Sequence, residues 1–129
     1  MESQKSDLWI LAEVVSCSFL QRNGYVIIER NYRCPYGEID VIAVKDQEII
    51  FIEVKSRSRN MQTTFSSVSI RKRLKIIRSA TTYIMENPQY DQHCMRFDVI
   101  GLIYHKKEQL FEIKHLEDAF RVDELEEYL

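Results

Sequence analysis

The sequence predicts an α/β sandwich with a mixed central sheet and flanking helices, in the order α-β-β-β-α-β-β. Three observations support this prediction. Apolar residues recur at helical spacing in two segments, near the start and in the middle of the chain. Other segments are rich in Val, Ile, Phe and Tyr and are bounded by turn residues, which is typical of strands. At 129 residues, without a repeat or a linker, the chain has the size of one ordinary domain.

Capping and turn residues set the expected bounds of each element. Ser6 or Asp7 can cap a first helix, and Gly24 is suited to end it. A Pro-Tyr-Gly turn separates the first two strands, and Pro88 stops the second helix. We therefore expect helices over 6–23 and 67–86, and strands over 25–33, 38–44, 48–56, 95–104 and 109–114.

The other segments lack a clear period. Residues 57–66 are polar, and we expect a loop there. The tail from Glu117 is acidic, and we expect it to form a short helix. We divide the chain into a single domain over 1–120 and an acidic C-terminal extension over 121–129.

Composition excludes several classes of protein. The hydrophobic content of 45% is enough for a core, and no stretch approaches the roughly 18 apolar residues of a membrane span. Cys17, Cys34 and Cys94 are widely spaced, which argues against a disulfide framework or a zinc site. The N-terminus lacks the pattern of a secretory signal. These features predict a cytoplasmic protein with no membrane segment.

Basic residues gather in one part of a chain whose net charge is −2. The segment from Lys55 to Arg78 contains eight Lys and Arg residues and no Asp or Glu. Such a segment can contact a phosphate backbone, although a solvated helix face gives the same pattern. We assign the candidate nucleic-acid contacts to Arg57, Arg71, Lys72 and Lys75.

Charged side chains also occur inside strands that should be buried. In the predicted strand over 48–56, Glu53 and Lys55 share one face with Ile49 and Phe51, because side chains alternate along a strand. Asp40 lies between apolar residues of the preceding strand, and a hairpin can bring it close to Glu53. Buried charges need a partner or a metal. An ordinary ion pair between Glu53 and Lys55, with Asp40 solvated, is the alternative interpretation.

A third carboxylate comes from the first predicted helix. Glu13 is its only charged residue between Asp7 and Arg22, and apolar residues surround it. Three converging carboxylates would repel one another, and Mg²⁺ or Mn²⁺ would relieve this repulsion because hard cations prefer oxygen ligands. Such an ion can activate water and neutralise charge on a phosphate that is being cut, and Lys55 can contact the same phosphate.

Several of these residues resemble a known family. The matching segments are Ala12-Glu13, Asn31 to Arg33, Gly37 to Asp40, Phe51 to Arg57, Lys72 with Ala80, Arg96 to Val99, and Glu117 to Phe120. Together they resemble the YraN (UPF0102) family of small bacterial proteins. That family is similar to PD-(D/E)xK nucleases and to archaeal Holliday-junction resolvases. The resemblance implies a restriction-endonuclease-like fold, with Asp40, Glu53 and Lys55 as the catalytic core and Glu13 as an accessory metal ligand.

Three functions remain open from the sequence. The leading hypothesis is a metal-dependent endonuclease that acts on DNA, including branched or structured DNA; DNA is favoured over RNA, although the sequence leaves both open. The second is a nucleic-acid-binding module with the nuclease fold and little or no cleavage. The third is a structural or assembly protein that binds a partner through its acidic tail. Analogy with junction resolvases also suggests a homodimer. Arg96 and Asp98, which share a strand face, are expected to form a structural pair.

Overall fold

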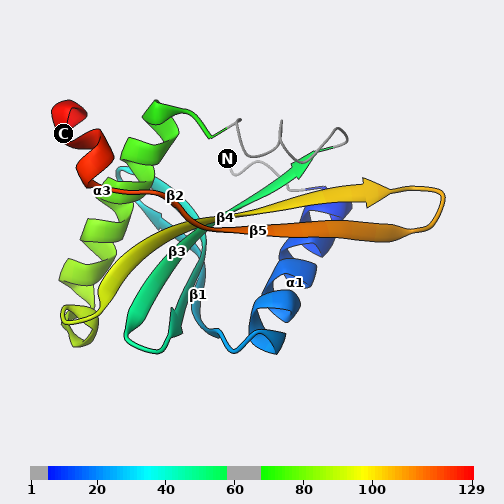
Figure 1. Cartoon of the computed structure of the whole chain (residues 1–129), viewed down its shortest axis with the longest axis horizontal. Coiled ribbons are helices and arrows are strands. Elements are labelled where there is room, and N and C mark those ends of the chain that lie inside the picture. The colour runs from blue at the N-terminus through cyan, green and yellow to red at the C-terminus, as the bar shows by residue number, and fades with distance from the viewer. Residues whose placement is uncertain (1–5, 58–67) are drawn as a thin grey trace.

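The computed structural model describes residues 6–57 and 68–129, and its elements follow the predicted order (Figure 1). The helices are α1 (Asp7–Arg22), α3 (Ile70–Glu86) and the short 3-10 helices η1 (Pro88–Tyr90) and η2 (Asp123–Tyr128). The strands are β1 (Val26–Cys34), β2 (Gly37–Lys45), β3 (Glu48–Arg57), β4 (Cys94–His105) and β5 (Leu110–Phe120). The predicted order α-β-β-β-α-β-β is therefore confirmed.

The five strands form one sheet in the order β1-β2-β3-β4-β5. β3 and β4 are parallel, and the other neighbouring pairs are antiparallel. Parallel neighbours need a crossover, and α3 lies in the chain between them. The sheet is thus mixed, as predicted, and the β4–β5 hairpin extends beyond the other strands (Figure 1).

A helix covers each face of the sheet. Phe51 belongs to the core that includes residues of α3, whereas the next residue, Ile52, belongs to the core that includes residues of α1. Both strand faces are therefore buried, which explains why β2 and β3 are nearly continuous apolar runs. Across residues 6–57 and 68–129, no helix has the length and apolar character that a membrane span requires.

Serine side chains cap both long helices at their N-termini. Ser6 Oγ accepts a hydrogen bond of 3.1 Å from the backbone N–H of Trp9, as the sequence predicts for α1. Ser69 Oγ accepts one of 3.2 Å from the N–H of Lys72, so α3 begins at Ile70 and not at residue 67. Gly24 follows α1 with φ of 87°, a left-handed conformation that favours glycine.

The C-terminal part differs from the prediction. β5 continues to Phe120 instead of ending at residue 114, so Glu117 lies in a strand and not in a helix. The reason is the pairing of Phe120 with Phe97 of β4 after a register shift, which buries both rings. The short helix η2 follows, and its Leu125 packs into the core on the α3 side. The expected loop over 57–66 lies outside the described residues, except that Arg57 ends β3.

Candidate active site

The site lies where β2 and β3 separate. Their ladder runs from the pair Lys45 and Glu48 to the pair Val41 and Ile52. Beyond that pair, Asp40 Oδ2 accepts a hydrogen bond of 2.8 Å from the backbone N–H of Val54. A side-chain carboxylate therefore bonds to β3 where the ladder between the backbones has ended.

The backbone of β2 turns at Asp40. Val41 packs on the α1 side of the sheet, whereas Ile39, two residues away, packs on the α3 side. Regular alternation would put both on one face. On β1, the residue between the partners of Ile39 and Val41 is Asn31, which has φ of 53°. Asp40 lies at this local change of face, opposite a residue in the left-handed conformation, and its side chain does not follow the regular alternation of the sheet.

A cavity of about 370 Å³ opens at this point. Its walls come from α1, β2, β3 and α3, and the residues that line it are Trp9, Glu38, Asp40, Glu53, Val54, Lys55, Ser56 and Lys72. The structure thus brings together the three residues predicted as the catalytic core, and Lys72 with them. Asp40 and Glu53 are 7% and 6% exposed, so their carboxylates lie at the bottom of the cavity and not on an open surface.

Burial dominates the electrostatics of the two carboxyl groups. Burial, followed by the charge of Glu53, raises the pKa of Asp40 to about 8, although the hydrogen bond from Val54 opposes the shift. Burial also raises the pKa of Glu53, while Lys72 and Lys55 lower it. Lys55 Nζ is 3.9 Å and Lys72 Nζ is 3.7 Å from Glu53 Oε1. The raised pKa of Asp40 means that the buried site resists a second negative charge beside Glu53, and an added cation would favour the ionised form of both groups.

The donor set determines which ion could bind. Among the described residues, no group of three or more His, Cys, Asp and Glu side chains is close enough to hold a metal. Asp40 and Glu53 remain as a pair of oxygen donors. Mg²⁺ fits such a pair, because it commonly binds through one or two carboxylates and keeps several waters.

Glu13 is not brought into the cavity wall. It is buried in α1, as the sequence predicts, at 3% exposed. Burial, with a smaller contribution from the charge of Glu13, raises the pKa of Cys17, and Glu13 is not among the residues that line the cavity. Its role as a third metal ligand stays a prediction.

The predicted nucleic-acid contacts occupy different positions. Lys72 lines the cavity, whereas Arg71 and Lys75 are exposed on α3. The side chain of Arg57 lies outside the described residues. The special position of Lys72 was missed in the sequence, where it resembles its basic neighbours. Its place in the first turn of α3, directly after the Ser69 cap, is the local signal that distinguishes it.

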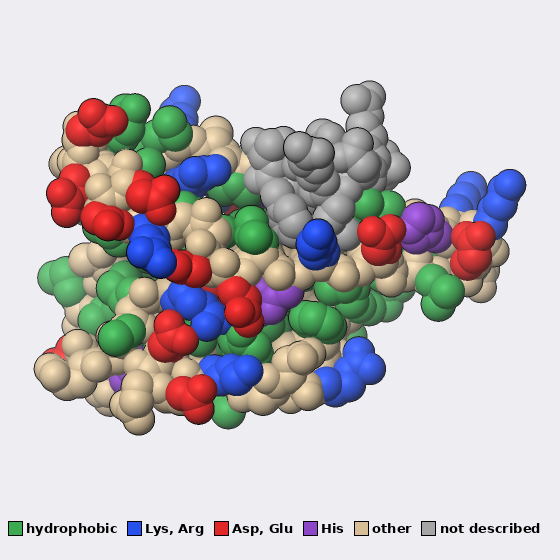
Figure 2. Space-filling view, in the orientation of Figure 1, with side chains coloured by type: hydrophobic (Ala, Val, Ile, Leu, Met, Phe, Trp, Pro, Cys, Tyr) green, Lys and Arg blue, Asp and Glu red, His purple; other side chains and the backbone are tan. Residues whose placement is uncertain are grey.

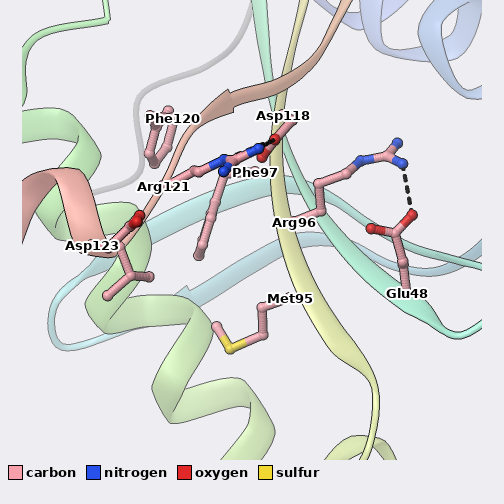
Figure 3. A pocket seen from close by; sticks show the side chains of 9 residues that line it. Glu48, Met95, Arg96, Phe97, Asp118, Phe120, Arg121 and Asp123 are labelled. Carbon is pink, nitrogen blue, oxygen red and sulfur yellow. Dashed lines mark hydrogen bonds and ion pairs between the residues drawn. The ribbon is translucent and has the colours of Figure 1, made fainter.

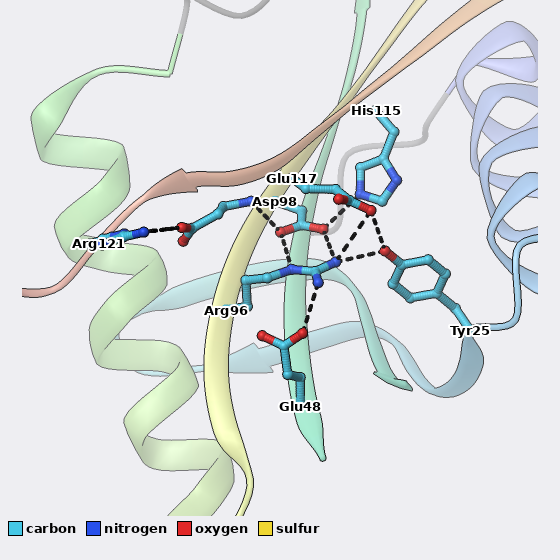
Figure 4. Close-up of polar contacts among 8 residues, drawn as sticks. Tyr25, Glu48, Arg96, Asp98, His115, Glu117 and Arg121 are labelled. Carbon is cyan, nitrogen blue, oxygen red and sulfur yellow. Dashed lines mark hydrogen bonds and ion pairs between the residues drawn. The ribbon is translucent and has the colours of Figure 1, made fainter. Parts of the chain in front are cut away.

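A second polar cluster joins β4, β5, the first residue of β3 and Tyr25, which directly precedes β1 (Figure 4). Arg96 donates two hydrogen bonds of 2.9 and 2.7 Å to Asp98, which confirms the predicted pair. His115 Nε2 is 2.6 Å from Asp98 Oδ2, and the N–H of Asp118 is 2.9 Å from Oδ1. Arg96 also reaches the hydroxyl of Tyr25 at 2.6 Å. The part played by His115 was not predicted from the sequence.

Another cavity, of about 420 Å³, lies beside this cluster (Figure 3). Its two arginines already have carboxylate partners: Arg96 bonds to Glu48 at 3.0 Å, and Arg121 to Asp118 at 2.8 Å. Figure 2 likewise shows acidic and basic side chains interleaved on this face of the molecule. Because these charges satisfy one another, we assign no site to this cavity.

The fold and the cavity define an α/β protein of mixed sheet with an acidic site flanked by lysines. The family model described as "Uncharacterised protein family UPF0102" matches residues 12–102, a range that contains Asp40, Glu53, Lys55 and Lys72. The chain belongs to the UPF0102 family, as its resemblance predicts.

Relatives of similar length support this membership. A UPF0102 protein of Clostridium perfringens strain 13 is 41% identical over 123 residues, which are 95% of this chain and 100% of the relative. One of Moorella thermoacetica is 39% identical over 111 residues, 85% of this chain and 92% of the relative. One of Clostridium botulinum strain Loch Maree is 35% identical over 117 residues, 90% of this chain and 95% of the relative.

Among solved structures, a repair endonuclease from Pyrococcus abyssi matches with a TM-score of 0.42 and 16% identity. The match covers 78% of this chain but only 39% of that protein. A likeness of this size says nothing about the activity of this chain. The functional argument therefore depends on the residues of the cavity.

Proposed function

We propose that this protein is a metal-dependent endonuclease that hydrolyses phosphodiester bonds in DNA, including branched or structured DNA. The observation that carries the proposal is the cavity in which Asp40 and Glu53 lie side by side, nearly buried, with Lys55 and Lys72 close to Glu53. Burial raises the pKa of both carboxyl groups, and the charge of Glu53 raises that of Asp40 further; such buried acids are costly unless a cation or a reaction uses them.

Asp40 and Glu53 would hold Mg²⁺ or Mn²⁺, which supplies an activated water and charge neutralisation at the phosphate when bound. The chain's own groups do the rest. The N–H of Val54 fixes the Asp40 carboxylate at 2.8 Å, so this ligand is oriented before anything binds. Lys55 and Lys72 offset the charge of Glu53 and would face a phosphate that enters the cavity.

A nucleic-acid-binding module without cleavage is the first rival. Such a module gains nothing from two carboxylates at the bottom of its binding cavity, because they repel the phosphate that it must attract. The cost of burying charge weighs against a purely structural or assembly protein, because apolar residues would fill the cavity at a lower cost in stability. The carboxylate pair therefore favours an enzyme over both rivals.

The test is a cleavage assay on end-labelled single strands, duplexes, flaps and four-way junctions, as DNA and as RNA. Each is incubated with Mg²⁺, with Mn²⁺ and with a chelator. We expect metal-dependent products from at least one DNA substrate with the wild type and none with Asp40→Asn. Arg121→Ala, in an exposed ion pair remote from the cavity, is the control for preparation quality. Equal product from the wild type and Asp40→Asn would reveal a contaminating nuclease and contradict the proposal.

A further inference from the structure

The tryptophan of this chain lies at the candidate active site. The sequence has one Trp, and it is Trp9, in the first turns of α1. Its side chain is partly buried against the core on the α1 side of the sheet and also lines the cavity of Asp40 and Glu53. It is the aromatic member of that lining, which otherwise consists of charged and small residues and one valine. Packing against the core fixes this side chain at the cavity wall.

The size of the cavity limits what can enter it. At about 370 Å³ it is near the lower end of the range of roughly 300–1,000 Å³ typical of sites for single small molecules. That space suits one nucleotide better than a base pair. Asp40 and Glu53 are nearly buried, so a phosphate must enter the cavity to reach them.

A base attached to that phosphate then comes close to Trp9. In a regular duplex the faces of each base are covered by its stacked neighbours, and a base must leave the stack to meet a side chain. The cost of leaving is lowest at single strands, mismatches and branch points. An aromatic ring that receives the base by stacking compensates for this cost and tolerates any sequence, because every base has a π face.

We propose that Trp9 stacks on an unpaired base beside the scissile phosphate, so that the substrate is single-stranded or locally unpaired DNA and not regular duplex. This inference rests on the proposed function and narrows its substrate class. It assigns to α1 a direct contact with the substrate. The basic residues of α3 would contact phosphates, because their side chains are cationic. The side chain that α3 contributes to the lining of this cavity is Lys72.

Because Trp9 is the one tryptophan of the chain, its fluorescence reports directly on the proposed contact. The wild type, in chelator to prevent cleavage, is titrated with a fluorescein-labelled thymidine single strand and with a fully complementary, blunt-ended duplex that carries the label at an internal position. Anisotropy of the label measures binding, and tryptophan emission measures contact with Trp9. We expect tryptophan emission to fall on saturation with the single strand and to remain unchanged on saturation with the duplex.

Variants separate stacking from packing. Trp9→Leu keeps an apolar side chain against the core but removes the ring, and we expect it to bind the single strand roughly 5- to 150-fold more weakly. Trp9→Phe keeps an aromatic ring and should retain most of the affinity. If Trp9→Leu does not fold, the affinity of Trp9→Phe still tests whether an aromatic ring is sufficient. Tyr36→Ala removes an exposed aromatic side chain that does not line the cavity, and it should bind like the wild type.

The outcomes distinguish this inference from the proposed function. Binding by anisotropy with unchanged emission, and equal affinity for Trp9→Leu, would overturn the role of Trp9 and leave the endonuclease proposal standing. Equal quenching of tryptophan emission by the duplex and by the single strand would overturn the preference for unpaired bases. A lack of binding to any nucleic acid in this titration would overturn the role of Trp9, whereas the absence of metal-dependent products in the cleavage assay would overturn the endonuclease proposal.

Discussion

Lys72 Nζ lies 3.7 Å from Glu53 Oε1, slightly nearer than the 3.9 Å between Lys55 Nζ and the same oxygen. The two lysines reach Glu53 from different elements, Lys72 from the first turn of α3 and Lys55 from β3 itself. Both lower the pKa of Glu53, which burial raises. The ion pair within β3, which was the alternative interpretation of the sequence, is therefore part of a three-residue arrangement that depends on how α3 packs on the sheet.

Replacement of Lys72 should accordingly affect catalysis and not only binding. We expect Lys72→Ala to lower the cleavage rate at saturating substrate by about 10²-fold, the usual effect of removing one preorganised group that stabilises the transition state. Lys72→Arg should recover part of the rate because it keeps the charge. Lys75→Ala, which removes an exposed lysine one turn further along α3, is the matched control. If both alanine variants change only KM, Lys72 is a phosphate contact like its neighbours.

The cavity residues should behave as one catalytic unit. Asp40→Asn, Glu53→Gln and Lys55→Ala should each lower cleavage by orders of magnitude. The double variants should lose little more, because residues that act together show strongly non-additive effects. Single-turnover rates of the three single and three double variants measure this. Additive losses, or a single variant with near wild-type rate, would remove that residue from the assignment.

The proximity of Asp40 and Glu53 could be predicted because it depends on local features. A short turn joins β2 and β3, and alternation along β3 places Glu53 and Lys55 on one face. The change of face at Asp40 could not be predicted. It occurs opposite Asn31 of the neighbouring strand, which has φ of 53°, and nothing in the sequence near Asp40 indicates that conformation.

Longer-range features were beyond the sequence for a similar reason. Lys72 lines the cavity because of the way α3 packs on the sheet, which helical spacing alone does not determine. The length of β5 depends on its pairing with β4 across a register shift between Phe97 and Val99. His115 meets Asp98 only in that register. Packing partners that are distant in sequence decide these contacts.

The cluster around Asp98 should contribute to stability independently of the cavity. Burial alone would raise the pKa of Asp98, but hydrogen bonds from His115 and Arg96 and from the N–H of Asp118 lower it overall. Asp98→Asn leaves Arg96 without its buried partner. We expect a loss of about 3–5 kcal/mol in the free energy of unfolding at pH 7, as for other broken buried ion pairs. Urea unfolding of both proteins measures it.

The pH dependence of this effect has a definite sign. Because the folded pKa of Asp98 is lowered, the carboxylate stabilises the protein above its ordinary pKa of about 3.9, and this stabilisation is lost as pH falls through the folded value. The difference between the wild type and Asp98→Asn should therefore shrink in acid. Arg121→Ala, which breaks only an exposed ion pair, should unfold like the wild type. A difference that is constant down to acid pH would mean that charge on Asp98 is unimportant.

The basic residues in the first turns of α3 should determine the salt dependence of DNA binding. The logarithm of the affinity falls with the logarithm of salt concentration by about 0.9 per contacted phosphate on duplex DNA, and by about 0.7 on single strands. Replacing Arg71, Lys72 and Lys75 together with Ala should flatten the slope by about that amount for each phosphate that the variant no longer binds. Replacing Lys106 and Lys107, exposed on the β4–β5 turn, is the charge control. An equal flattening in the control would indicate a different binding surface.

The last prediction concerns metal and pH, and it needs no substrate. Burial and the charge of Glu53 raise the pKa of Asp40 to about 8, well above the ordinary value of about 3.9. Between those values the folded protein keeps a proton that the unfolded chain releases. The metal-free wild type should therefore become less stable as pH rises from about 4 to 8. Asp40→Asn cannot ionise, so its stability should change less over this window and exceed that of the metal-free wild type near pH 8.

Metal should reverse the order of the two proteins. An ion that binds only the folded state stabilises it by RT ln(1 + [L]/Kd), about 2.7 kcal/mol at a hundredfold excess over Kd. Mg²⁺ binds weakly through two carboxylates, so we expect a smaller effect at millimolar concentration. Calorimetry should show a higher Tm for the wild type with Mg²⁺ or Mn²⁺ than with chelator, a larger difference at pH 8 than at pH 6, and a weaker response of Asp40→Asn. If Glu53 and Lys55 form only an ion pair, metal leaves every Tm unchanged. Identical melting of both proteins with and without metal would therefore exclude an ion at Asp40 and Glu53.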